Sequence, residues 1–148
     1  MRKSIIAILM TFCLSIMTYA QTPRDRATEL KEQAQSSLNQ KDYIKARYLF
    51  KKAYEAFATR ENYPQAIECG VQANALYVRE NFYKEGFELC RDMDQLIWTG
   101  EQNQKKVFYD LRFLVNKERL QMYTALKNPA QAKTQLNKLE ETANLAKN

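Results

Sequence analysis

Apolar residues recur at steps of three and four along most of this chain, which is the spacing of one face of an α-helix. Small residues accompany large ones on these faces, so a neighbouring helix can approach closely while the larger side chains fill the remaining space. The spacing occurs in three sets: Tyr43, Ala46, Phe50 and Ala53; Tyr83, Gly86, Cys90 and Met93; and, in weaker form, Ala132, Leu136 and Leu139. A packing face that repeats along a sequence is typical of a stacked array of helices.

Short polar turns divide the chain into six expected helices, and no segment shows the sustained alternation of a β-strand. Asp42 is a good N-cap, and Pro64 and Pro129 suit the first turns of the helices that they begin. Thr99-Gly100-Glu101 predicts a further break, with Gly100 capping the preceding helix. Helices joined by such short turns must alternate in direction. We therefore expect an all-α fold of three stacked antiparallel helical hairpins, at about residues 25–60, 64–98 and 101–146.

The first twenty residues have the features of an export signal. A basic start is followed by an uncharged, mostly apolar run over residues 5–17, and Thr18-Tyr19-Ala20 offers the small-residue pattern of a cleavage site. The apolar run is shorter than the ~20 residues that a membrane-spanning helix needs. We expect a signal peptide cleaved after Ala20, with an uncleaved anchor as the alternative. The mature domain, residues 21–148, would then be periplasmic or secreted.

The second helix of the first hairpin carries the series Asp42-Tyr43-x-x-Ala46-x-x-x-Phe50-x-x-Ala53-Tyr54. In order and spacing this series resembles the tetratricopeptide repeat, a family of helical hairpins. Weaker matches continue along the chain at the family's other positions: Ala34, Tyr77, Tyr83, Gly86, Tyr123, Ala132 and Leu136. The small residues at 46, 86 and 132 are 40 and 46 residues apart (86 − 46 and 132 − 86), against about 34 in the family. Longer helices than the family's are therefore expected here.

The resemblance implies a concave face built by the first helix of each hairpin. By register, the side chains that would line it are mostly long, polar or mildly basic: Lys31, Gln35, Gln72, Val78, Arg79, Lys117, Gln121 and Thr124. Such side chains suit hydrogen bonding to an extended peptide. Lys31 matches the first lysine of the family's clamp for acidic chaperone tails. Glu118, however, occupies a position that is basic in that clamp and would repel an acidic tail. The expected partner is therefore a protein or peptide, not identified further.

An exported helical-repeat region of this kind is also similar to the periplasmic sensor segment of signalling proteins from Bacteroidetes-type bacteria. In those proteins the segment precedes a membrane helix and a kinase or DNA-binding domain. Gln21 after an alanine cleavage position suits that source, as does a composition rich in Lys, Asn, Gln and Tyr. The resemblance implies a non-catalytic binding scaffold, either free-standing or part of a longer regulator.

The available residue types argue against an enzyme and against a bound metal or cofactor. The chain has no histidine, the commonest general base and zinc ligand. Cys69 and Cys90 lie on apolar helix faces without the spacing of a metal site, and whether they form a disulfide stays open. Without residues 1–20 the net charge is +4, from 21 basic minus 17 acidic residues. The two signs are interleaved along the helices, so no nucleic-acid partner and no membrane insertion of the mature chain are expected.

Two other function classes remain open. A small-ligand sensor would have an apolar pocket between the fifth and sixth helices, lined by Phe108, Leu111, Val115 and Leu136, whereas a structural spacer would bind nothing specific. Trp98 is expected to seal the junction between the second and third hairpins, with an exposed contact as the alternative.

Overall fold

The structure, a computed structural model, describes residues 25–147, and within that range it contains six α-helices and no β-strand. The expected signal peptide, residues 1–20, lies outside the described residues. The helices are α2 (Arg26–Asn39), α3 (Tyr43–Thr59), α4 (Tyr63–Arg79), α5 (Tyr83–Gln104), α6 (Tyr109–Ala125) and α7 (Pro129–Leu145). The expected all-α class is therefore confirmed.

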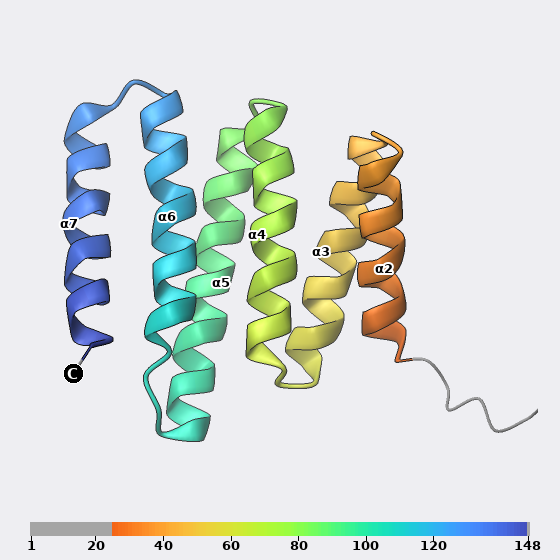
Figure 1. Ribbon diagram of the computed structural model, residues 1–148, viewed down its shortest axis with the longest axis horizontal. Helices are drawn as coiled ribbons and strands as arrows, with labels where there is room; N and C mark the ends of the chain where they lie inside the picture. The colour runs from red at the N-terminus through yellow and green to blue at the C-terminus, as the bar shows by residue number, and fades with distance from the viewer. Residues whose placement is uncertain (1–24, 148) are drawn as a thin grey trace, which may run out of the picture.

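The helices follow one another across the molecule in chain order, with α2 and α7 at opposite ends (Figure 1). Each helix packs against the one before it, and α4 also contacts α6. Figure 1 shows that consecutive helices run in opposite directions, as the short connections between them require.

Four of the connections share one geometry, in which a helix ends in a single left-handed residue: Lys41 (φ 62°), Glu61 (φ 56°), Asn81 (φ 63°) and Lys127 (φ 53°). The next residue donates its backbone N–H to the carbonyl five positions earlier, as Asp42 does to Ser37 at 2.9 Å. Three of these next residues also cap the following helix: Asp42, Asn62 and Asn128. The residue after the left-handed one thus closes the end of one helix and caps the start of the next, which fixes the length of the turn.

Small side chains occupy the crossing points of the helices, as the repeated spacing predicts. Alanines on three helices are completely buried: Ala27, Ala34, Ala46, Ala53, Ala66 and Ala73. The largest buried side chains fill the space around them: Phe50, Tyr63, Ile67, Met93, Ile97 and Met122. The prediction of a buried face for the weaker third set is only partly right, because Leu139 is buried but Leu136 is 45% exposed.

The expected break at Thr99-Gly100-Glu101 is wrong, because α5 continues through these residues to Gln104. The second hairpin therefore extends past residue 98, and the first helix of the third begins at Tyr109 rather than at 101. The glycine is needed inside the helix. A Cβ at Gly100 would lie 2.8 Å from Cε2 of Phe108 and 3.0 Å from two ring carbons of Tyr63. These two rings pack 5.7 Å apart between centroids. Gly100 thus marks the close approach of two aromatic rings.

Replacing Gly100 with alanine should therefore lower the free energy of unfolding by about 1 kcal/mol. Overpacking a filled site costs roughly 1–3 kcal/mol, of which the better helix propensity of alanine returns about 1 kcal/mol. Urea unfolding of the two proteins measures the difference. Gln102→Ala, an exposed change on the same helix, should stay within about 0.5 kcal/mol of the parent protein. A Gly100→Ala protein as stable as the parent would contradict the tight packing at this position.

Candidate functional site

The predicted binding residues lie on α2, α4 and α6, which polar contacts join in sequence. Nζ of Lys31 on α2 lies 2.8 Å from Oε1 of Gln65 and 2.7 Å from Oε2 of Glu68, both on α4. Nδ2 of Asn74 on α4 donates to Oε2 of Glu118 on α6 at 3.0 Å. The first helices of successive hairpins are thus directly connected, and we call their shared layer the α2–α4–α6 layer (Figure 1).

The six predicted residues differ in how free their polar groups are. The half-buried Lys31 forms an ion pair with Glu68, so its charge is compensated within the protein. Gln35 donates to Asn39 on its own helix at 3.1 Å, and the guanidinium carbon of Arg79 lies 3.9 Å from the ring centroid of Tyr43. Gln72, Lys117 and Gln121 are exposed, as are Gln35 and Arg79. The surface that these residues form accordingly presents more amide groups than uncompensated positive charges.

The link between α4 and α6 is a buried polar pair. Asn74 is completely buried and Glu118 is 4% exposed. Burial raises the pKa of the Glu118 carboxyl above its ordinary value, although the Asn74 hydrogen bond and the nearby Lys117 charge act in the opposite direction. The side-chain oxygen Oδ1 of Asn74 has no hydrogen-bond partner. A Cβ at Gly86 would lie 3.0 Å from this oxygen, so the glycine provides the space for Asn74.

The sequence contained a signal for this pair. Glu118 falls on the apolar stripe of its helix, three residues after Val115, four before Met122 and seven after Leu111, all of which are buried. A charged residue in that register is expected to be buried and to need a partner. Register with the tetratricopeptide clamp instead suggested that Glu118 faced a groove, which its burial contradicts.

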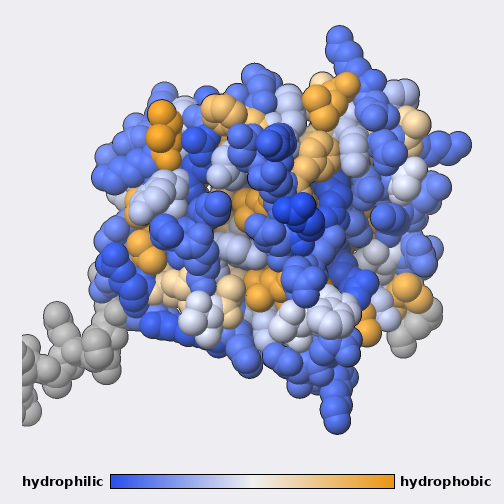
Figure 2. Space-filling model, turned by 180° about the vertical axis from the view of Figure 1, so that it is seen from behind, coloured by the Kyte–Doolittle hydropathy of each residue, from blue (hydrophilic) through white to orange (hydrophobic). Residues whose placement is uncertain are grey.

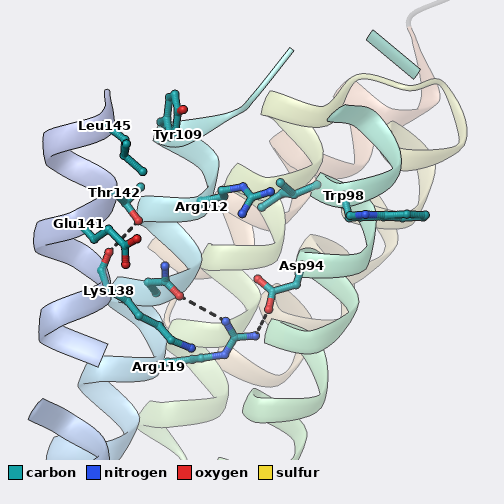
Figure 3. Close-up of a pocket in the computed structure, with 11 residues that line it drawn as sticks. Asp94, Trp98, Tyr109, Arg112, Arg119, Lys138, Glu141, Thr142 and Leu145 are labelled. Carbon is teal, nitrogen blue, oxygen red and sulfur yellow. Dashed lines mark hydrogen bonds and ion pairs between the residues drawn. The ribbon is translucent and has the colours of Figure 1, made fainter. Parts of the chain in front are cut away.

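A second candidate site is a groove with α6 as its floor and α5 and α7 as its walls (Figure 3). Its volume is about 450 Å³, and charged and aromatic side chains line much of it. The lining residues are Asp94, Ile97, Trp98, Tyr109, Arg112, Asn116, Arg119, Lys138, Glu141, Thr142 and Leu145. We call it the α5–α7 groove.

This groove differs from the apolar pocket that the sequence suggested between the last two helices. Of the four residues expected to line that pocket, none lines the α5–α7 groove. Val115 is completely buried, and Leu136 is largely exposed. Phe108 and Leu111 border a separate hollow of about 560 Å³ near Pro64. The expectation that Trp98 seals a junction is also wrong, because its side chain is 55% exposed on the α5 wall of the groove.

Both arginines of the groove floor are held in place by carboxylates. Glu101, 7% exposed, accepts from Nε of Arg112 at 2.7 Å, from Nη2 of the same residue, and from the Phe108 backbone N–H at 2.9 Å. The Arg112 hydrogen bond is the main reason that the pKa of Glu101 is lowered. Nη2 of Arg119 lies 2.5 Å from Oδ2 of Asp94 on α5. These pairs were not predicted from the sequence, because Glu101 was expected to lie in a turn.

Exposed apolar side chains are scattered rather than gathered on the face shown in Figure 2, which is mostly hydrophilic. Among the described residues the two most exposed large ones are Ile44 and Tyr48, one turn apart on α3. No helix within residues 25–147 has the length and apolar character needed to cross a bilayer. The same residues contain no cluster of three or more His, Cys, Asp or Glu side chains suited to a metal ion.

Comparison of the chain with protein-family models, with curated proteins and with solved structures finds no significant match. Its function must therefore be inferred from its own residues.

Replacing Glu118 with glutamine should stabilise the protein at neutral pH. The folded-state pKa of Glu118 is raised, so its favourable contribution is present below the unfolded pKa and is lost as pH rises through the folded value. A glutamine carries no charge, still accepts from Asn74 and adds a donor for the unpartnered Oδ1. We expect a gain of about 1 kcal/mol at pH 7 that shrinks towards pH 4, measured by urea unfolding. Glu140→Gln, an exposed change on α7, serves as the control. A loss of stability at pH 7 would show that Glu118 is favourable as an anion.

Cys69 and Cys90 are free and completely buried, which answers the question of a disulfide between them. Burial raises the pKa of the Cys69 thiol to about 11 and that of Cys90 to about 12. Because the thiolate is the reactive form, neither should react measurably with iodoacetamide in the folded protein at pH 8. Both should react in guanidinium without a reductant, as mass spectrometry of their peptides would show. A requirement for reductant would indicate a bridge instead.

Proposed function

We propose that this protein is an exported, non-catalytic scaffold that binds a peptide or protein segment on the α2–α4–α6 layer. In this proposal its helices form three tetratricopeptide-like hairpins, and the layer is the concave face of the stack. The expected export signal places the domain in the periplasm or outside the cell, where it would serve as an adaptor or as the sensor part of a signalling protein.

The observation that carries the proposal is the direct connection of the three first helices. Lys31 bridges α2 and α4, and the Asn74–Glu118 pair bridges α4 and α6. The binding residues, which were predicted from their register on three separate helices, therefore lie in one continuous layer. A partner segment lying across that layer would contact all three helices at once.

The chemistry of this layer favours an extended segment with a free backbone. Gln35, Gln72 and Gln121 each carry both a donor and an acceptor, which is what an unpaired peptide group requires. Arg79 and Lys117 add two exposed cations, whereas the charge of Lys31 is already compensated by Glu68. Recognition would accordingly depend on main-chain hydrogen bonds more than on the partner's net charge.

A peptide selection tests this proposal. The protein, expressed from the full 148-residue sequence, would be used to select binding peptides from a displayed library of random peptides. The dissociation constants of the selected peptides would then be measured. The combined variant Gln72→Ala, Lys117→Glu, Gln121→Ala changes three exposed residues of the layer. It should weaken binding about tenfold or more, which corresponds to roughly 1.4 kcal/mol.

A matched control makes the same three kinds of change elsewhere. Gln95→Ala, Gln131→Ala and Lys51→Glu alter exposed residues on α5, α7 and α3. This control should bind the selected peptides like the parent protein, and circular dichroism should show both variants to be folded. Equal affinity of the layer variant and the control would place peptide binding elsewhere on the molecule and refute the proposal.

A further inference from the structure

The α5–α7 groove is large enough for a small molecule and lies on a different side of α6 from the predicted peptide-binding residues. Its volume of about 450 Å³ falls within the range of roughly 300–1,000 Å³ usual for ligand sites. Arg112, Asn116 and Arg119 form its floor at steps of four and three, so they share one face of α6. Lys117 and Gln121 project from another face of the helix and do not line the groove.

The two arginines of the floor are fixed before any ligand arrives. Glu101 holds Arg112 through Nε and Nη2, and Asp94 holds Arg119 through Nη2. Nη1 of Arg119 also lies 3.5 Å from Oδ1 of Asn116. Because both side chains already have a defined position, an incoming anion would not have to pay the full entropic cost of ordering them. Each guanidinium retains N–H groups that these carboxylates do not use.

Lys138 supplies a third cation from the α7 wall of the groove. Among residues 25–147 its ammonium group forms no ion pair, unlike the two arginines. Figure 3 shows the Lys138 side chain extending towards Arg119, so that the two converge at one end of the groove. An anion placed there would meet one ammonium and one guanidinium.

The other end of the groove is apolar. Figure 3 shows Tyr109 and Leu145 at the end away from Arg119, on α6 and α7 respectively. The Leu145 side chain is 47% exposed and would be covered by a ligand lying there. The groove therefore presents cations at one end and an aromatic and an aliphatic side chain at the other.

Two carboxylates also line the groove and restrict where an anion can lie. The Asp94 carboxylate forms an ion pair with Arg119, so its charge is compensated. Glu141 is exposed on the α7 wall, three residues and about one turn from Lys138. Its charge would repel an anion placed midway along the groove, which leaves the end at Arg119 and Lys138 as the favourable position.

We propose that the α5–α7 groove binds a small amphipathic carboxylate. Its carboxylate group lies between Arg119 and Lys138, and its apolar body extends towards Tyr109 and Leu145. This site is independent of the peptide-binding layer, so either proposal can fail while the other holds.

Isothermal titration calorimetry tests this proposal. Trp98, the only tryptophan of the chain, is among the residues of the α5 wall, but Figure 3 shows its side chain extending away from Arg112 and Arg119, so the heat of binding is measured rather than the indole fluorescence. The full-length protein would be titrated with octanoate. Octanol keeps the apolar body without the charge, and acetate keeps the charge without the body. Octanoate should bind saturably, with a dissociation constant at least about tenfold below that of either control compound.

Two substitutions with opposite expected effects on octanoate affinity separate a binding role from a structural one. Lys138→Gln should weaken octanoate binding about fivefold or more, because it removes the unpaired cation. Glu141→Gln should strengthen binding by about twofold, because it removes the repelling charge. Lys133→Gln, an exposed change on the same helix outside the groove, should leave the dissociation constant unchanged.

Three results would overturn the proposal: no saturable heat of binding with octanoate, equal binding of octanol, or equal octanoate affinity in the Lys138→Gln and Lys133→Gln proteins. Because all three substituted side chains are exposed, the variants are expected to fold, and circular dichroism would verify this before each titration.

Discussion

The arrangement of this molecule depends on how closely its helices approach at their crossing points. Gly70 on α4 faces Met93 on α5, Gly86 on α5 faces Met122 on α6, and in each case a Cβ would lie under 3 Å from the methionine sulfur. Buried alanines have the same role between α2, α3 and α4. Only where the backbones come this near can short side chains such as Asn74 reach a partner on another helix. The Asn74–Glu118 contact within the α2–α4–α6 layer is therefore a consequence of the small residues.

The two polar bridges between first helices differ in their energetics. The Lys31–Glu68 pair is partly exposed, so water screens it and its contribution to stability is small. The Asn74–Glu118 pair is buried, where an incompletely satisfied polar group is costly. Between α4 and α6 the structure thus gives up stability for a specific contact.

Local signals in the sequence were sufficient for most helix boundaries, because caps and turns depend on neighbouring residues. Asp42, Pro64 and Asn128 each mark a helix start that the structure contains. The break at Gly100 was mispredicted because the role of this glycine is decided by Tyr63 on another helix. The α5–α7 groove could not be predicted at all, since its width depends on how far apart α5 and α7 lie on either side of α6. Periodicity determines which face of a helix is buried, but not the spacing between helices.

The turns in which one residue ends a helix and starts the next have a further consequence. The left-handed residues Lys41, Glu61 and Asn81 are each separated by 20 positions (61 − 41 and 81 − 61), so the first turns form a regular module of one helix and one turn. Contacts run chiefly between successive modules. A pair of modules could therefore be duplicated or deleted within a gene while the remaining ones kept their fold, and such a protein would change its reach by whole steps during evolution.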